Sequence, residues 1–218
     1  SMRICPLCVV GASAGLALLG AAGLMSLDRA ITSPAQAAAQ ASAAKSAEAS
    51  GPFDIDAVHS SVVFRIKHLG VANFYGMFEK ISGKFHIDPA NLDKSMIEAT
   101  VDVASIDSNN KDRDQHLLSD SFFAAKEFPT MTFKSTKFTK TGENTFDVAG
   151  ELTLLGKTRP VTTKVEFTGQ GPGRQPGVTV AGFEARLEFK RSDFGMSYLI
   201  PGVSDEVGLI VALEGTRK

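Results

Sequence analysis

Four histidines are the residues of this chain best suited to acid-base or metal chemistry, and they lie at positions 59, 68, 86 and 116. None is spaced as H-x-H, H-x-x-H or H-E-x-x-H, so a metal site would have to assemble from distant segments. We therefore predict no metal site. His68 continues an alternating apolar run and would be a polar group at the end of an apolar strand. It would either face a ligand or form a hydrogen bond with a loop.

Motifs for catalysis and for phosphate binding are missing. His59 and Ser60, with the acidic loops, could suggest a hydrolase, but G-x-S-x-G is absent and the serines stand in ordinary turn or strand contexts. Neither G-x-x-x-x-G-K-[ST] nor G-x-G-x-x-G occurs. We expect a protein that is not an enzyme and uses no cofactor. The formal net charge is −1 and no Lys or Arg cluster contains interleaved aromatics, so we expect no nucleic-acid partner.

Two cationic segments could contact the polar part of a ligand. One contains Arg113 and His116, and the other is residues 190–195 (KRSDFG), which could hold an anionic or polar head group. Structural roles compete with this interpretation. Asp193 could cap its turn or pair with Arg113, and Phe194 could plug the end of a β-barrel. Arg113 could also bond the acidic residues at 112 or 205. We predict a polar mouth, the open end of a ligand pocket, where side chains contact the polar part of the ligand. Its residues are His68, Arg113, His116, Arg191 and Ser192.

Alternating apolar and polar residues predict the elements that would position these side chains. The pattern is typical of strands with one buried face and one solvent-facing face, and Gly, Pro, Asn and Asp separate most of the runs. Because long helical periods are lacking, we predict an all-β fold, an antiparallel barrel of about eight strands. The strands are expected around residues 62–66, 78–87, 97–103, 130–138, 146–154, 161–167, 183–189 and 207–213.

One segment interrupts the strand pattern. Residues 109–133 (NNKDRDQHLLSDSFFAAKEFPTMTF) run from a charged stretch through an aromatic pair to a strand-like run that follows Pro129. We predict a short helical or turn insertion over residues 115–126 and a second one near residues 71–75.

The composition favours an apolar barrel interior. All fifteen Phe lie at or beyond Phe53, and a barrel of about eight strands is either filled by its own side chains or just wide enough for one small ligand. Bulky residues on apolar strand faces are therefore the predicted tunnel wall. They are Phe64, Ile66, Phe78, Phe85, Phe133 and Phe189.

The amino-terminal segment has a different composition. An uncharged apolar stretch over residues 4–27 precedes a small-x-small cleavage signal that ends at Ala37, which is typical of a secretory signal peptide. The alternative is an uncleaved inner-membrane anchor, because about 20 apolar residues span a bilayer. The predicted organisation is a signal peptide or anchor over 1–37, a disordered linker over 38–52 and a barrel domain over 53–218.

Five segments together resemble the YceI-like, polyisoprenoid-binding family. The most specific is Arg113 to Pro129, in which R-D-x-H-L is followed by F-F and a strand that begins after a proline. The resemblance covers nearly the whole chain from Phe53 onward. The segments are FDIDAVHSSVVFRIKHL (53–69), GMFEKISGKFHI (76–87), RDQHLLSDSFFAAKEFP (113–129), GELTLLGKTRPV (150–161) and KRSDFGMSYLIPGVSDEV (190–207).

The resemblance implies a lipocalin-like barrel that is exported to the bacterial periplasm. It also implies an enclosed apolar ligand, such as a polyisoprenoid, a quinone tail or a fatty-acid derivative, which the protein would carry or sequester. Two other functions remain open: an enzyme that acts on a lipid, and a filled structural barrel with a protein-interaction role. The sequence also leaves open whether two copies pair as a homodimer.

Overall fold

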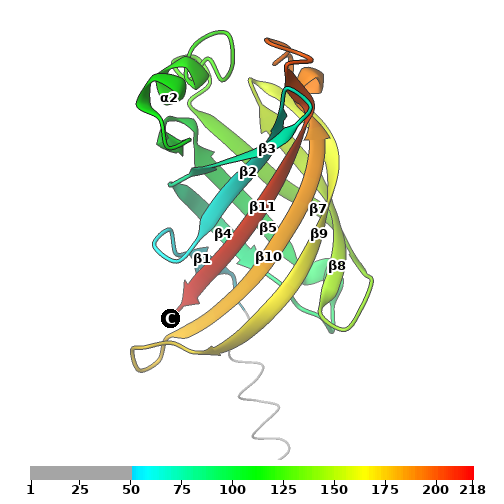
Figure 1. The fold of residues 1–218 in the computed structure, drawn as a ribbon. Helices are drawn as coiled ribbons and strands as arrows, with labels where there is room; N and C mark the ends of the chain where they lie inside the picture. The colour runs from blue at the N-terminus through cyan, green and yellow to red at the C-terminus, as the bar shows by residue number, and fades with distance from the viewer. Residues whose placement is uncertain (1–50) are drawn as a thin grey trace, which may run out of the picture. The chain divides into compact units, whose positions relative to one another are not determined.

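The computed structural model describes residues 51–218 (Figure 1). The predicted signal peptide or anchor and nearly all of the predicted linker lie outside the described residues. Within the described part of the chain, no helix has the length and apolar character needed to cross a membrane.

The described residues form one antiparallel sheet with short helical connections (Figure 1). The strands are β1 (Phe53–Ile55), β2 (Ser61–His68), β3 (Ala72–Phe78), β4 (Ile81–His86), β5 (Met96–Asp102), β6 (Ile106–Asp107), β7 (Thr130–Lys140), β8 (Thr145–Leu154), β9 (Lys157–Pro172), β10 (Thr179–Lys190) and β11 (Val203–Arg217). The helices are η1 (Leu92–Lys94), η2 (Val103–Ser105), α2 (Lys111–Leu117) and η3 (Arg191–Phe194).

Eight of the strands close into a ring. Their order is β1-β4-β5-β7-β8-β9-β10-β11, and the ring closes because β1 pairs with both β4 and β11. β11 also pairs with β2 over residues 203–212, and β2 continues the sheet through β3 to β6. The predicted antiparallel barrel of about eight strands with a short helical insertion is therefore confirmed.

Alternation places the apolar faces of these strands inside the barrel. On β8, Phe146, Val148, Leu152 and Leu154 are buried, while Glu151 between them is exposed. Because successive side chains on a strand point to opposite faces, one set fills the interior and the other meets water. The hydrophobic core therefore lies within the ring.

Two predicted local features are wrong. The second insertion, near residues 71–75, is instead the start of β3, which pairs with β2 after a three-residue loop in which Leu69 and Gly70 have positive φ. The single strand predicted over 78–87 is divided, because the chain turns between β3 and β4. The predicted helical or turn insertion over 115–126 is present but begins earlier: α2 starts at Lys111 and turns follow it to residue 127. The Asn110 side chain caps α2 by accepting a hydrogen bond from the Arg113 backbone N–H at 2.9 Å.

Several phenylalanine rings pack against glycines of other strands. A Cβ added to each of these glycines would lie within 2.3 to 2.5 Å of a ring carbon, so the position admits no larger residue without movement of the ring. Aromatic rings cover such backbone gaps in sheets and are thereby held in one orientation. The pairs are Phe64 on Gly76, Phe133 on Gly150 and Phe85 on Gly215.

Candidate functional site

A cavity of about 390 Å³ lies at the end of the barrel that carries α2 and η3. We call it the mouth cavity. Aromatic and aliphatic side chains make up most of its wall, and the polar and charged groups come from β2, β3, α2 and η3. Its lining is Phe64, Ile66, His68, Ala72, Asn73, Phe74, Phe78, Arg113, His116, Leu117, Phe122, Phe123, Met131, Leu154, Phe189, Arg191, Met196, Leu199, Val203, Val207 and Leu209.

Most of the predicted wall lies along this cavity. Four of the six predicted residues line it: Phe64, Ile66, Phe78 and Phe189. Phe133 lines a second cavity of about 60 Å³, which we call the inner cavity. Phe85 lines neither. Its ring is fully buried, with centroids 5.5 Å from Phe53 and 4.9 Å from Phe183, so it fills the interior near β1 instead of facing a cavity.

Arg191 is the most buried polar residue that lines the mouth cavity, and its side chain forms the most hydrogen bonds. Its side chain is 1% exposed, and its guanidinium donates to four backbone carbonyls, those of Met196, Tyr198, Val203 and Ser204, at 2.9 to 3.1 Å. Burial lowers the pKa of Arg191, although the charge of Asp205 opposes this shift. Because four of its five N–H groups already have partners, Arg191 holds the loop between η3 and β11 in place.

Ser192 lies outside the mouth cavity. Its hydroxyl and its backbone N–H donate to the two oxygens of Asp205 at 2.8 and 2.9 Å. Burial by itself would raise the pKa of Asp205, but these hydrogen bonds and the charge of Arg191 lower it below the ordinary value. Ser192 therefore fixes the start of η3 against β11. Phe194, on the same turn, is buried with its ring edge toward Phe189 at 5.4 Å, as the alternative of an internal plug predicted.

Arg113 also lines the mouth cavity, and it keeps more unused donors than Arg191 does. Its Nε donates to the Ser108 hydroxyl at 2.8 Å, one Nη2 hydrogen goes to the Ser108 carbonyl, and its guanidinium lies 4.4 Å above the Phe74 ring. Arg113 bonds to none of the acidic residues at positions 112, 193 and 205 that the sequence suggests as partners. The nearby Asp114 accepts a hydrogen bond from the Ser108 hydroxyl. Within residues 51–218, both Nη1 hydrogens of Arg113 lack a protein acceptor.

His68 and His116 both line the mouth cavity, and that they contact a ligand stays a prediction. His68 ends β2 and is exposed. His116 packs edge to face with two aromatic rings, at 5.1 Å from Phe122 and 5.6 Å from Tyr198, whose own centroids are 5.3 Å apart. This aromatic trio joins α2 to the loop that Arg191 holds.

Sequence reasoning missed several lining residues. Phe74 was placed in the wrongly predicted insertion, although Ala72, Phe74, Gly76 and Phe78 alternate along one face of β3 and could have identified the strand. Met196 and Leu199 belong to a loop, where no periodic pattern reports the direction of a side chain.

Comparison with known proteins now decides the family. The profile of the YceI-like domain matches residues 53–215. The chain belongs to the YceI-like family. A UPF0312 protein of Azotobacter vinelandii is 39% identical over 165 residues, which cover 76% of this chain and 85% of that protein.

Solved structures share the YceI-like fold. The crystal structure of Burkholderia cenocepacia BcnA superposes with a TM-score of 0.64 at 29% identity, covering 74% of this chain and 99% of BcnA. A polyisoprenoid binding domain from Saccharophagus degradans, implicated in plant cell wall breakdown, has a TM-score of 0.55 at 17% identity, with coverage of 74% and 96%. At that identity the second comparison shows the fold alone.

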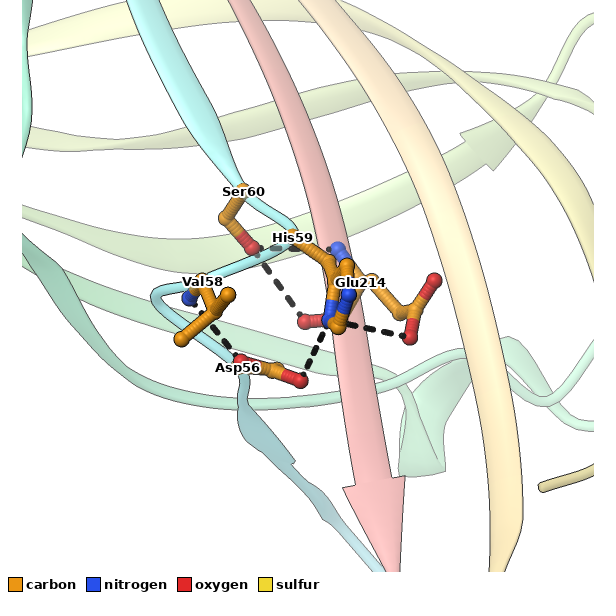
Figure 2. A network of polar contacts seen from close by, with 5 residues as sticks. All are labelled: Asp56, Val58, His59, Ser60 and Glu214. Atoms are coloured by element: carbon orange, nitrogen blue, oxygen red, sulfur yellow. Dashed lines mark hydrogen bonds and ion pairs between the residues drawn. The ribbon is translucent and has the colours of Figure 1, made fainter. Parts of the chain in front are cut away.

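The YceI-like barrel also carries a polar cluster on the turn between β1 and β2, shown in Figure 2. His59 Nδ1 lies 2.8 Å from Asp56 Oδ2 and 3.8 Å from Glu214 Oε1. The Ser60 hydroxyl bonds to the backbone N–H and carbonyl of Glu214 at 3.1 and 3.3 Å. Ser60 thus fastens the turn to β11. That the protein binds no metal stays a prediction.

The Asp56–His59 pair predicts a pH dependence of this turn. The hydrogen bond that the His59 ring donates to the Asp56 carboxylate, with the charges of Asp56 and Glu214, raises the pKa of His59 above 6.5. The stabilisation from charged His59 is therefore complete below pH 6.5 and is lost as the pH rises through the raised pKa. We expect Asp56→Asn to move the His59 titration, followed by NMR, down toward 6.5. An unchanged midpoint would contradict the assignment.

Proposed function

We propose that the protein binds a small molecule with a long apolar tail and a polar head group, and that it sequesters or carries this ligand. The observation that supports this most directly is the mouth cavity, which has an apolar wall and has cationic and imidazole groups at one end. Membership of the YceI-like family adds support, as does the polyisoprenoid binding domain that shares the fold. The proposed ligand class is a polyisoprenoid, a quinone tail or a fatty-acid derivative.

The free energy gained by burying an apolar tail is large enough for the proposed binding. Each buried methylene group contributes about 0.8 kcal/mol, so a tail with ~10 such groups gives a large gross gain before the costs of association are subtracted. A polar head group would lose several kcal/mol if it were buried without partners, which favours its placement at the open end. Such binding needs no catalytic residue.

Arg113 is the proposed contact for an anionic head group, because it faces the cavity with free N–H groups. We expect Arg113→Ala to weaken binding of farnesyl phosphate more than binding of farnesol, by about 1.5 to 3 kcal/mol, the range for a hydrogen bond to a charged group. Isothermal titration with the two ligands measures the difference. Lys111→Ala is a matched control, since it removes a cation from the same helix but outside the cavity lining.

Equal losses for both ligands, together with a lowered melting temperature, would contradict the head-group role of Arg113. They would indicate that its bonds to Ser108 and its contact with Phe74 serve only to hold α2 on the barrel.

Mass spectrometry of organic extracts from the purified protein tests the proposed function itself. We expect a co-purified lipid with a long apolar tail, and a protein that returns this lipid unaltered after incubation. Turnover of the extracted lipid would favour the alternative of an enzyme acting on it. A protein that yields no lipid and binds neither farnesol nor farnesyl phosphate would favour the filled structural barrel.

We further propose that the protein acts in the periplasm, with the amino-terminal segment removed near Ala37. Amino-terminal sequencing of the protein from its native compartment tests this proposal. Recovery of an intact amino terminus in the membrane fraction would favour the tethered alternative.

A further inference from the structure

We propose that Met131 and Leu209 form a partition inside the barrel that sets how far a ligand tail can enter, so that the protein selects tails by length. This inference rests on the proposed function and names the feature of the ligand that the interior discriminates. Met131 and Leu209 are the two residues that line both the mouth cavity and the inner cavity. The two cavities therefore meet at these side chains.

The barrel topology places the two side chains on opposite walls. Met131 lies on β7 and Leu209 on β11, and in the closed ring these strands are separated by four steps in either direction. Met131 is 4% exposed and Leu209 is 6% exposed, so neither side chain turns out toward solvent. Two buried side chains from opposite walls that border the same two spaces lie across the lumen.

The space beyond the partition suits only an apolar group. Apart from Thr132 and Thr163, the inner cavity is lined by aliphatic and phenylalanine side chains. The Thr163 hydroxyl donates to the Arg186 carbonyl at 3.1 Å, so it is already engaged. Apolar cavities in proteins hold apolar guests in preference to water. The terminal carbons of an apolar tail would therefore enter the inner cavity once the partition is removed.

Methionine is well suited to a partition of this kind. Its side chain is unbranched and adapts to irregular spaces, and the thioether packs well against aromatic rings. Leucine on the opposite wall is bulkier near the backbone and narrows the lumen from that side. Truncation of either residue should join the cavities of about 390 and 60 Å³ into one longer space.

Titration with geraniol, farnesol and geranylgeraniol, which differ by one isoprene unit each, tests the partition. For the unaltered protein we expect affinity to rise with chain length and then to level off once the tail end reaches Met131. In Met131→Ala the rise should continue one isoprene unit further, with a gain of about tenfold for the first alcohol beyond the original plateau, because its last carbons become buried.

Three variants make the test specific. Met131→Leu conserves volume and should keep the original plateau. Ala185→Leu, added to Met131→Ala, should refill the inner cavity that Ala185 lines and abolish the gain. Leu209→Ala removes the opposite half of the partition, so it replaces Met131→Ala if thermal unfolding shows that variant to be unstable.

The outcomes separate this inference from the proposed function. If the alcohols bind but the affinity profile is the same in the unaltered protein, Met131→Ala and Leu209→Ala, the partition is refuted and the binding function stands. If no alcohol binds to any variant, the binding function and the partition are both overturned.

Discussion

We expect Arg191→Ala to lower the free energy of unfolding by about 3 to 5 kcal/mol, the range for breaking one side of a buried charged network. The substitution removes the donors from four carbonyls at once, and buried acceptors without partners are costly. For a domain of this size the melting temperature should fall by roughly 6 to 20 °C. Thermal unfolding followed by circular dichroism measures the change.

Two further variants show whether the geometry of Arg191, and not its charge alone, stabilises the loop. Arg191→Lys keeps the charge, but a single ammonium group cannot bond four carbonyls in a plane, so most of the loss should remain. Ser192→Ala removes one hydrogen bond to Asp205 and should cost about 1 kcal/mol. A stability close to that of the unaltered protein for both Arg191 variants would refute the structural role.

Phe64→Asp should weaken binding of farnesol by roughly 100-fold or more, because a bound tail would have to displace water from a carboxylate in the cavity wall. Phe64 lies in the mouth cavity, where its ring packs over Gly76 and lies 5.8 Å from the Phe78 ring. The fold should tolerate the change better than a charge at fully buried Val62, since the cavity side of position 64 can admit water.

The pH dependence separates loss of binding from loss of structure. As the pH falls through the carboxyl pKa, which is about 3.9 for an unperturbed Asp, farnesol affinity should recover toward the value for the neutral variant Phe64→Asn. Phe64→Leu keeps the wall apolar and should bind nearly as well as the unaltered protein. Normal binding by a folded Phe64→Asp protein would mean that the tail does not contact this wall.

The strand pattern predicted the barrel because the alternation on β8, β10 and β11 depends only on neighbouring residues. The same local information placed Phe64 and Phe189 along the cavity, since both continue apolar strand faces. It failed for Phe85, whose position on an apolar face does not distinguish a cavity wall from a packed interior. That distinction depends on Phe53, Phe183 and Gly215, which are distant in sequence.

The polar residues were harder to assign. Arg113 and Arg191 look alike in the sequence, since both are cations beside apolar elements. In the structure Arg113 keeps free donors toward the cavity, whereas most donors of Arg191 bond to backbone carbonyls. The difference arises because the loop after η3 folds back over Arg191, whereas Arg113 leans on Phe74 at the rim. Loop paths of this kind leave no periodic signal in the sequence.

The closure of the barrel through β1 has a mechanical consequence. β1 pairs with each of its neighbours, β4 and β11, at only two positions, whereas β10 and β11 pair at twelve. The pairings of β1 with β4 and β11 are thus the shortest in the ring, and β1 directly follows the amino-terminal segment in the sequence. A pull on that segment would load these few hydrogen bonds first, and their rupture would bare the edges of β4 and β11 to strands of other molecules.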